Sequence, residues 1–119
     1  MPKSILVAED DVYLVNLYRK ALQKSGFDVR VSQSLKDVRD QLRLAPFDLF
    51  LCDIHLDDGS AVDYLKEIAD QIADQDMEII IASGDSRYRT VCERLGIEFY
   101  LEKPISIEAL ITLVHRLLD

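Results

Sequence analysis

The 119-residue chain contains no tryptophan and only two cysteines and two histidines. Cys52 and Cys92 lie far apart, without the spacing of a metal or redox motif, so we expect both to be reduced and buried. His55 and His115 are equally far apart, which leaves little from which to build a zinc site. Proline and glycine are scarce, and no linker rich in them divides the chain. We therefore expect one domain over residues 1–119.

Basic residues are also in deficit, with 14 Lys and Arg against 22 Asp and Glu and a formal net charge of −8. Such a surface repels phosphates, so we expect no direct binding of nucleic acid by this chain. No apolar run approaches the roughly 20 residues that cross a bilayer, which predicts no membrane segment. The chain passes from Met1 into a strand-like run without the apolar stretch of a signal peptide. We expect a cytoplasmic protein.

What the chain does contain is a series of five short apolar runs. They are rich in Ile, Val, Leu and Phe and show little alternation with polar residues, which is typical of strands covered on both faces of a parallel sheet. The runs are Ile5–Ala8, Val29–Val31, Leu49–Cys52, Ile79–Ala82 and Phe99–Leu101.

Longer segments with helical periodicity separate these runs. A Ser34…Asp37 pair resembles a capping box, Ser106 is placed to cap the last segment, and Gly26 and Gly96 follow two of the segments as helix-ending residues. This alternation of strand and helix, five times over, predicts an α/β domain with a parallel sheet and helices on both faces. The predicted helices are Val12–Ser25, Ser34–Leu44, Ser60–Asp74 (with Val62, Leu65, Ala69 and Ile72 aligned on one face), Ser86–Leu95 and Ser106–Leu118.

Polar side chains follow four of the five predicted strands. Ligands of open parallel sheets bind beyond the carboxyl ends of the strands, so these side chains are expected to converge on one rim. A single acid there is best explained as a solvated loop residue, but four strand ends with matching chemistry are poorly explained that way. Clustered carboxylates repel one another, and Mg²⁺ is a cation that would neutralise them. The residues are Glu9, Asp10 and Asp11 after the first strand, Asp53 after the third, Ser83 and Gly84 after the fourth, and Lys103 and Pro104 after the fifth.

Four sequence blocks, in this order and at these intervals, resemble the signature blocks of response-regulator receiver domains, and the resemblance covers the whole chain. It implies a flavodoxin-like, doubly wound fold with strand order 2-1-3-4-5 and five flanking helices. It also implies a phosphorelay signalling domain of a two-component system, not an enzyme, with a sensor histidine kinase or histidine phosphotransfer protein as partner. The blocks are Ile5-Leu-Val-Ala-Glu-Asp-Asp11, Leu49-Phe-Leu-Cys-Asp53, Ile79-Ile-Ile-Ala-Ser-Gly84 and Tyr100-Leu-Glu-Lys-Pro104.

The resemblance also implies a role for each matching residue. Asp53 would be the phosphoacceptor, and Asp10 and Asp53 would bind Mg²⁺ directly, helped by Glu9 through water and by the backbone carbonyl of His55. Ser83 would bond a phosphoryl oxygen, Lys103 would pair with the phosphoryl group or with Asp53, and Tyr100 would be an aromatic switch that turns inward when Ser83 moves. Taken alone, Lys103 is also explained as a surface ion-pair partner and Tyr100 as a core residue.

The loop after Asp53 departs from the family pattern. Asp57 stands where proline is common and Ala61 where glycine is common, so we expect a more mobile or differently shaped loop. His55 and Asp85 occupy positions that flank the phosphoryl group in receivers and tune the lifetime of the phosphorylated state. Both are equally well explained as exposed loop residues.

We expect the predicted fourth helix, fifth strand and last helix to form a protein-binding face, as in the family that the chain resembles; the alternative is a broad buried face with an ordinary surface. The fourth helix contains Arg87, Arg89 and Arg94, and the last is more apolar than one sheet-facing stripe requires. The candidate occupants are an output domain, a target protein or a second copy of the chain. Two other functions remain open: an aspartyl-phosphate phosphohydrolase, although His55 stands where such enzymes usually have a second aspartate, and a receiver-like module that is never phosphorylated.

Overall fold

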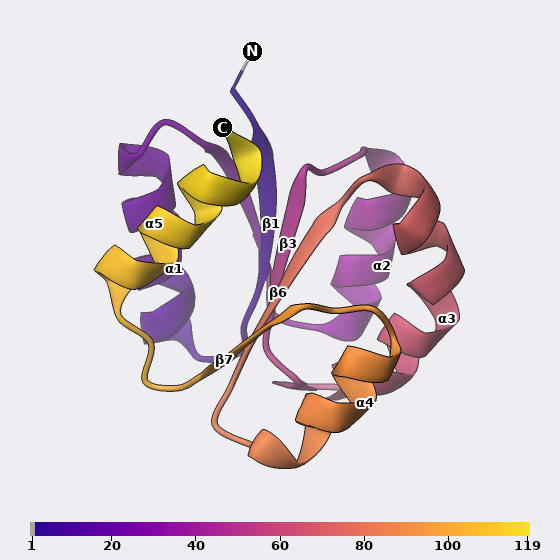
Figure 1. Ribbon diagram of the computed structural model, residues 1–119. Helices are drawn as coiled ribbons and strands as arrows, with labels where there is room; N and C mark the ends of the chain where they lie inside the picture. Colours follow the sequence, from indigo (N-terminus) through magenta and orange to yellow (C-terminus); the bar gives the residue numbers. More distant parts are fainter. Residues whose placement is uncertain (1) are drawn as a thin grey trace.

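A five-stranded parallel sheet runs through the middle of the molecule (Figure 1). The computed structural model describes residues 2–119, without the side chains of residues 69–75. The strand order is β2-β1-β3-β6-β7, and every pair is parallel, which confirms the predicted order. The strands are β1 (Ser4–Ala8), β2 (Asp28–Ser32), β3 (Leu49–Cys52), β6 (Glu78–Ser83) and β7 (Phe99–Glu102).

Helices cover both faces of this sheet, as predicted. On one face lie α1 (Val12–Lys24) and α5 (Ile107–Leu118), and on the other lie α2 (Leu35–Leu44), α3 (Ala61–Gln75) and α4 (Arg89–Arg94) (Figure 1). Successive residues of a central strand therefore enter two different apolar cores, since side chains alternate between the faces of a sheet. No helix in the described part of the chain is long and apolar enough to span a membrane.

Local hydrogen bonds explain where several helices begin. The Ser34 hydroxyl accepts from the backbone N–H of Asp37 at 3.1 Å, and the Ser106 hydroxyl accepts from Ala109 at 3.1 Å, so both predicted caps are confirmed. The Asp37 side chain does not complete a capping box, because it accepts from the Gln41 amide at 3.0 Å instead. Asp11, which the sequence groups with the acidic rim, caps α1 through Leu14.

The predicted helix Ser86–Leu95 is present but is not one regular α-helix. Ser86–Tyr88 forms a 3₁₀ turn (η1), and α4 itself covers only Arg89–Arg94. The physical reason is local, since the Asp85 carboxylate accepts from the backbone N–H of Arg87 at 3.1 Å and closes a tight turn.

A small hairpin that the sequence did not predict follows β3. Its strands β4 (His55–Leu56) and β5 (Gly59–Ser60) are antiparallel, with Asp57 and Asp58 in the turn. The loop therefore has a definite shape, while its greater mobility stays a prediction. The predicted alignment of Ala69 and Ile72 in α3 lies outside the described residues. Both cysteines are free and buried, as expected.

Candidate functional site

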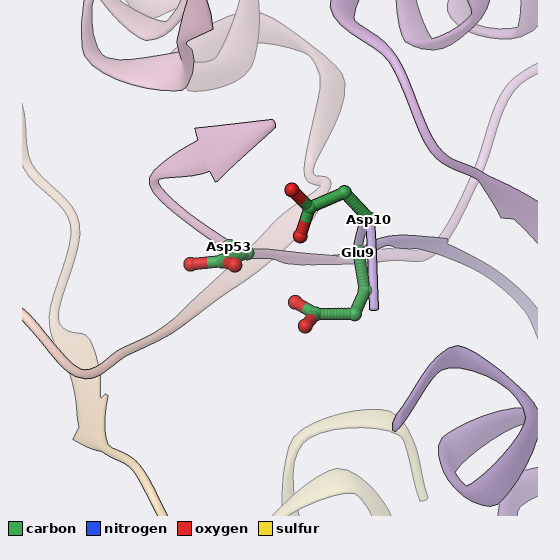
Figure 2. Close-up of side chains that lie close together, drawn as sticks. All are labelled: Glu9, Asp10 and Asp53. Carbon is green, nitrogen blue, oxygen red and sulfur yellow. The ribbon is translucent and has the colours of Figure 1, made fainter. Parts of the chain in front are cut away.

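Three carboxylates meet at the carboxyl ends of β1 and β3. These strands are neighbours with Ala8 opposite Cys52, so the residues that follow each strand emerge side by side. Figure 2 shows the side chains of Glu9, Asp10 and Asp53 directed toward a common space. One carboxylate oxygen from each lies within 4.8 Å of the others, which is close enough for a shared cation.

Within residues 2–119, the ammonium group of Lys103 reaches this cluster from the edge of the sheet. Lys103 follows β7, which is separated from β3 by β6, so its long side chain is needed to cross the distance. Its Nζ donates to Glu9 Oε1 and Oε2 at 2.8 and 2.9 Å and to Asp53 Oδ2 at 3.2 Å. The backbone N–H of Lys103 donates to the Ser83 carbonyl at 3.0 Å, and the Lys103–Pro104 peptide bond is cis.

Burial makes the charges of this cluster interact strongly. Glu9 is only 2% exposed and Asp53 8% exposed. Burial raises the pKa of Glu9 to about 7; the hydrogen bond from Lys103 opposes this shift and the neighbouring Asp53 adds to it. Burial alone would lower the pKa of Lys103, but its bonds to Glu9 and the charge of Asp53 leave it above its ordinary value. Glu9 and Asp53 thus share the ammonium group of Lys103, with the carboxylate of Asp10 close by, and a hard cation with oxygen ligands fits this donor set.

Ser83 and Tyr100 both contact Asp85, which lies in the loop after β6. The Ser83 hydroxyl, fully buried, accepts from the backbone N–H of Asp85 at 3.1 Å. The Tyr100 hydroxyl donates to the backbone carbonyl of Asp85. The ring of Tyr100 is buried in the core, with the guanidinium carbon of Arg89 4.9 Å from its centroid. Tyr100 is therefore a core residue that already lies inward in this structure, and its role as a switch stays a prediction.

The side chains of His55 and Asp85 contact each other across two loops. His55 Nε2 lies 3.3 Å from Asp85 Oδ2, while Arg87 donates to the two oxygens of the same carboxylate at 2.9 and 2.6 Å. The Arg87 guanidinium holds the pKa of Asp85 well below its usual range. From the sequence, Arg87 was expected only as part of a surface on the fourth helix. Its opposite charge two residues after Asp85 was the available signal for this contact.

The fold and this rim can be compared with known proteins. A family model described as the response regulator receiver domain matches residues 5–115. The chain belongs to this receiver family. Receiver domains act in two-component signalling with histidine kinases, so the chain is a signalling domain of that kind.

Two curated relatives illustrate the range of proteins that contain such a domain. The swarming motility regulation protein RssB of Serratia marcescens is 33% identical over 113 residues, covering 93% of this chain and 51% of the relative. The DNA-binding transcriptional regulator NtrC of Rhizobium meliloti is 28% identical over 117 residues, covering 97% of this chain and 24% of the relative. The receiver domain thus spans about half of one relative and a quarter of the other.

The relatives' names describe proteins that are longer than this chain. The name of NtrC includes DNA binding, but the alignment covers only a quarter of that protein. The prediction that nucleic acid is not bound concerns the 119 residues of this receiver domain alone and stays a prediction.

Two solved structures show the same fold. A receiver domain from Methanospirillum hungatei superposes with a TM-score of 0.88 at 22% identity, covering 98% of this chain and 93% of that chain. The response regulator TrrA of Thermotoga maritima, solved in complex with Mg²⁺ and a beryllium fluoride, gives 0.84 at 24% identity and covers 98% and 99%.

Proposed function

We propose that this receiver domain accepts a phosphoryl group on Asp53, in a Mg²⁺-dependent reaction, from the phosphohistidine of a sensor histidine kinase or histidine phosphotransfer protein. The observation that carries the proposal is the arrangement at the rim of the sheet. Carboxylate oxygens of Glu9, Asp10 and Asp53 lie within 4.8 Å of one another, and Lys103 Nζ is 3.2 Å from Asp53 Oδ2.

The transfer itself requires little covalent chemistry from the protein. An oxygen of Asp53 attacks phosphorus and forms the new O–P bond, while the P–N bond breaks and its electron pair returns to the donor's imidazole nitrogen. A carboxylate nucleophile needs no general base. Lys103, a compact point charge already in contact with Asp53 and Glu9, balances negative charge on the transferred group.

The residues that would hold Mg²⁺ are those of the acidic cluster. Asp10 and Asp53 would bind it directly, Glu9 through water, and His55 through its backbone carbonyl. When bound, the ion would offset negative charge on the Asp53 carboxylate and on the oxygens of the incoming phosphoryl group. Lys103 contacts Glu9 and Asp53 from the side of β7, so it and the cation would share the charge of the cluster.

Ser83 would link phosphorylation of Asp53 to a change at the α4–β7–α5 surface. A hydroxyl can donate and accept at once, so Ser83, which accepts from Asp85, retains its hydrogen for a phosphoryl oxygen. Drawing Ser83 toward that oxygen would move Asp85, whose carbonyl is the acceptor for the Tyr100 hydroxyl. The phosphoryl group would thus favour one population of the α4–β7–α5 surface, by about 1–3 kcal/mol. An output domain, a target protein or a second copy would bind there.

Intact-protein mass spectrometry with acetyl phosphate and Mg²⁺ tests the proposal. We expect one phosphoryl adduct, stable in acid and labile in base, which peptide mapping assigns to Asp53. Asp53→Ala should abolish it, and Asp40→Ala, which changes an exposed acid of α2, should leave it unchanged. An adduct of full strength on the Asp53→Ala protein, or none on the parent with active donor, would show that Asp53 is not the acceptor.

A further inference from the structure

The turn of the hairpin after Asp53 is anchored to a helix that is distant in sequence. Asp58 Oδ1 accepts from the backbone N–H of Leu35 at 2.6 Å, and Oδ2 accepts from Lys36 at 3.1 Å. These are the first two residues of α2. A helix leaves its first N–H groups without partners inside the helix, and a carboxylate at that end also meets a favourable dipole. With Ser34 bonding the third N–H, of Asp37, the first three residues of α2 all have acceptors for their N–H groups.

The same hairpin is fixed at its base beside the acceptor. The backbone N–H of Asp53 donates to the Ala8 carbonyl at 2.9 Å, and that of Ala61 donates to the Ile54 carbonyl at 2.7 Å. Between base and turn, Leu56 is 7% exposed and packs in the core under α2 and α3. A two-stranded hairpin this short is not stable by itself, so its shape depends on these attachments.

We infer that Asp58 is a positioning residue whose contact with α2 sets the orientation of the His55 backbone carbonyl toward the metal. This inference rests on the proposed function. A backbone ligand has no side chain by which it can be aimed, so only the path of the hairpin directs it. Asp57 stands where a proline would stiffen the turn, and the carboxylate of Asp58 supplies the restraint from outside the turn.

Loss of this restraint has a specific consequence for metal binding. Mg²⁺ requires near-octahedral geometry at short distances, so a carbonyl ligand that samples several orientations binds it more weakly. The folded domain and the acidic cluster would remain, because Glu9, Asp10 and Asp53 are positioned by β1 and β3. The expected defect is therefore a lower affinity for Mg²⁺, with phosphorylation restored when Mg²⁺ is saturating.

The matched pair Asp58→Asn and Asp57→Asn tests the inference, since both remove one negative charge from the same exposed turn. Calorimetric titration of each protein with MgCl₂ alone should give a dissociation constant at least threefold higher for Asp58→Asn than for Asp57→Asn. Asp58→Glu keeps the charge but displaces the carboxylate, and should also weaken binding. Amide hydrogen exchange at Leu35 and Lys36 should accelerate in the Asp58 variants only, and thermal melting checks that each variant is folded.

The possible outcomes distinguish failure of the inference about Asp58 from failure of the proposed Mg²⁺-dependent function. Faster exchange at Leu35 and Lys36 with unchanged Mg²⁺ affinity would mean that the contact exists but does not position a ligand, which overturns the inference. Unchanged exchange in both Asp58 variants would mean that the contact does not restrain α2 in solution, which overturns it as well. A parent protein that binds no Mg²⁺ would instead refute the proposed function, and the inference with it.

Discussion

The carboxylate of Glu9 is buried, and burial disfavours its charged form. It is 2% exposed, lies beside Asp53, and shares the one ammonium group of Lys103 with that residue. Buried carboxylates are tolerated when they are paired, and here two of them compete for one partner. Among the described residues, one ammonium group thus faces two buried carboxylates, and we expect an effect on the stability of the metal-free protein.

Stability of the metal-free protein should fall between about pH 5 and pH 7. The pKa of Glu9 is raised from 4.5 to about 7, so the folded state binds this proton more tightly than the unfolded chain does. The stability that this proton contributes is complete below pH 4.5 and is lost as the pH rises through about 7. The loss should be roughly 1–3 kcal/mol, since one pKa unit corresponds to about 1.4 kcal/mol. Urea unfolding in the presence of a chelator at several pH values measures it.

Glu9→Gln should remove most of this pH dependence, because glutamine has no proton to lose in that range. The exposed Glu98→Gln is the matched control and should retain the parental slope. If Glu9→Gln and the parent lose stability equally over this range, another group titrates and the charge of Glu9 is not the cause.

At the scale of single residues, sequence patterns identified side chains that follow strands. Glu9, Asp53 and Lys103 meet because parallel strands end at one edge of a sheet, and that rule requires only the strand positions. The contact of Asp58 with α2 joins residues 22 and 23 positions apart through backbone N–H groups. Any residue except proline can supply such a donor, so the side chains at the start of α2 do not predict the contact.

Among the helices, α4 should be the least protected against hydrogen exchange. It has six residues, and its N-cap Tyr88 makes no side-chain capping bond within the described part of the chain. Short helices gain little from propagation, so local opening should cost less here than in the thirteen-residue α1. Exchange monitored by mass spectrometry should show faster deuteration of Ser86–Arg94 than of α1.

Addition of Mg²⁺ with beryllofluoride should change exchange at Ser86–Arg94 and at Tyr100 more than at α1. The proposed shift of Ser83 would move Asp85. Both the η1 turn and the hydrogen bond of the Tyr100 hydroxyl depend on Asp85. Changes confined to the loops around Glu9 and Asp53 would argue for a passive domain without a switch.

The ends of helices and strands could be predicted where a local residue marks the end or where the element is long enough to show periodicity. Gly26 and Gly96 follow helix ends with φ of 97° and 88°, a conformation that glycine adopts at little cost, so these ends could be located from sequence. The strands of the hairpin have two residues each, too few to show periodicity. The 3₁₀ turn before α4 depends on the hydrogen bond from the Arg87 N–H to the Asp85 side chain, and the spacing of apolar residues does not predict that bond.

For the whole molecule, Mg²⁺ should raise the melting temperature. A cation that binds the native acidic cluster and not the unfolded chain stabilises folding by roughly 2.7 kcal/mol at about 100 times its dissociation constant. For a domain of this size that corresponds to roughly 10 °C. The net charge of −8 also responds to salt, so the control is NaCl of equal ionic strength. Asp10→Asn should reduce the Mg²⁺ effect, and no effect in the parent would contradict the metal site.

The reaction rates of the two buried thiols can report local unfolding of the domain. Cys52 in β3 and Cys92 in α4 are 1% and 0% exposed, and burial raises the pKa of both thiols, so neither should react with a thiol reagent in the closed state. Unwinding of α4 alone would uncover Cys92, whereas Cys52 requires disruption of the sheet. Under native conditions Cys92 should therefore be labelled first, and single Cys→Ala variants identify each signal. Equal rates for the two would mean that α4 opens only when the entire domain unfolds.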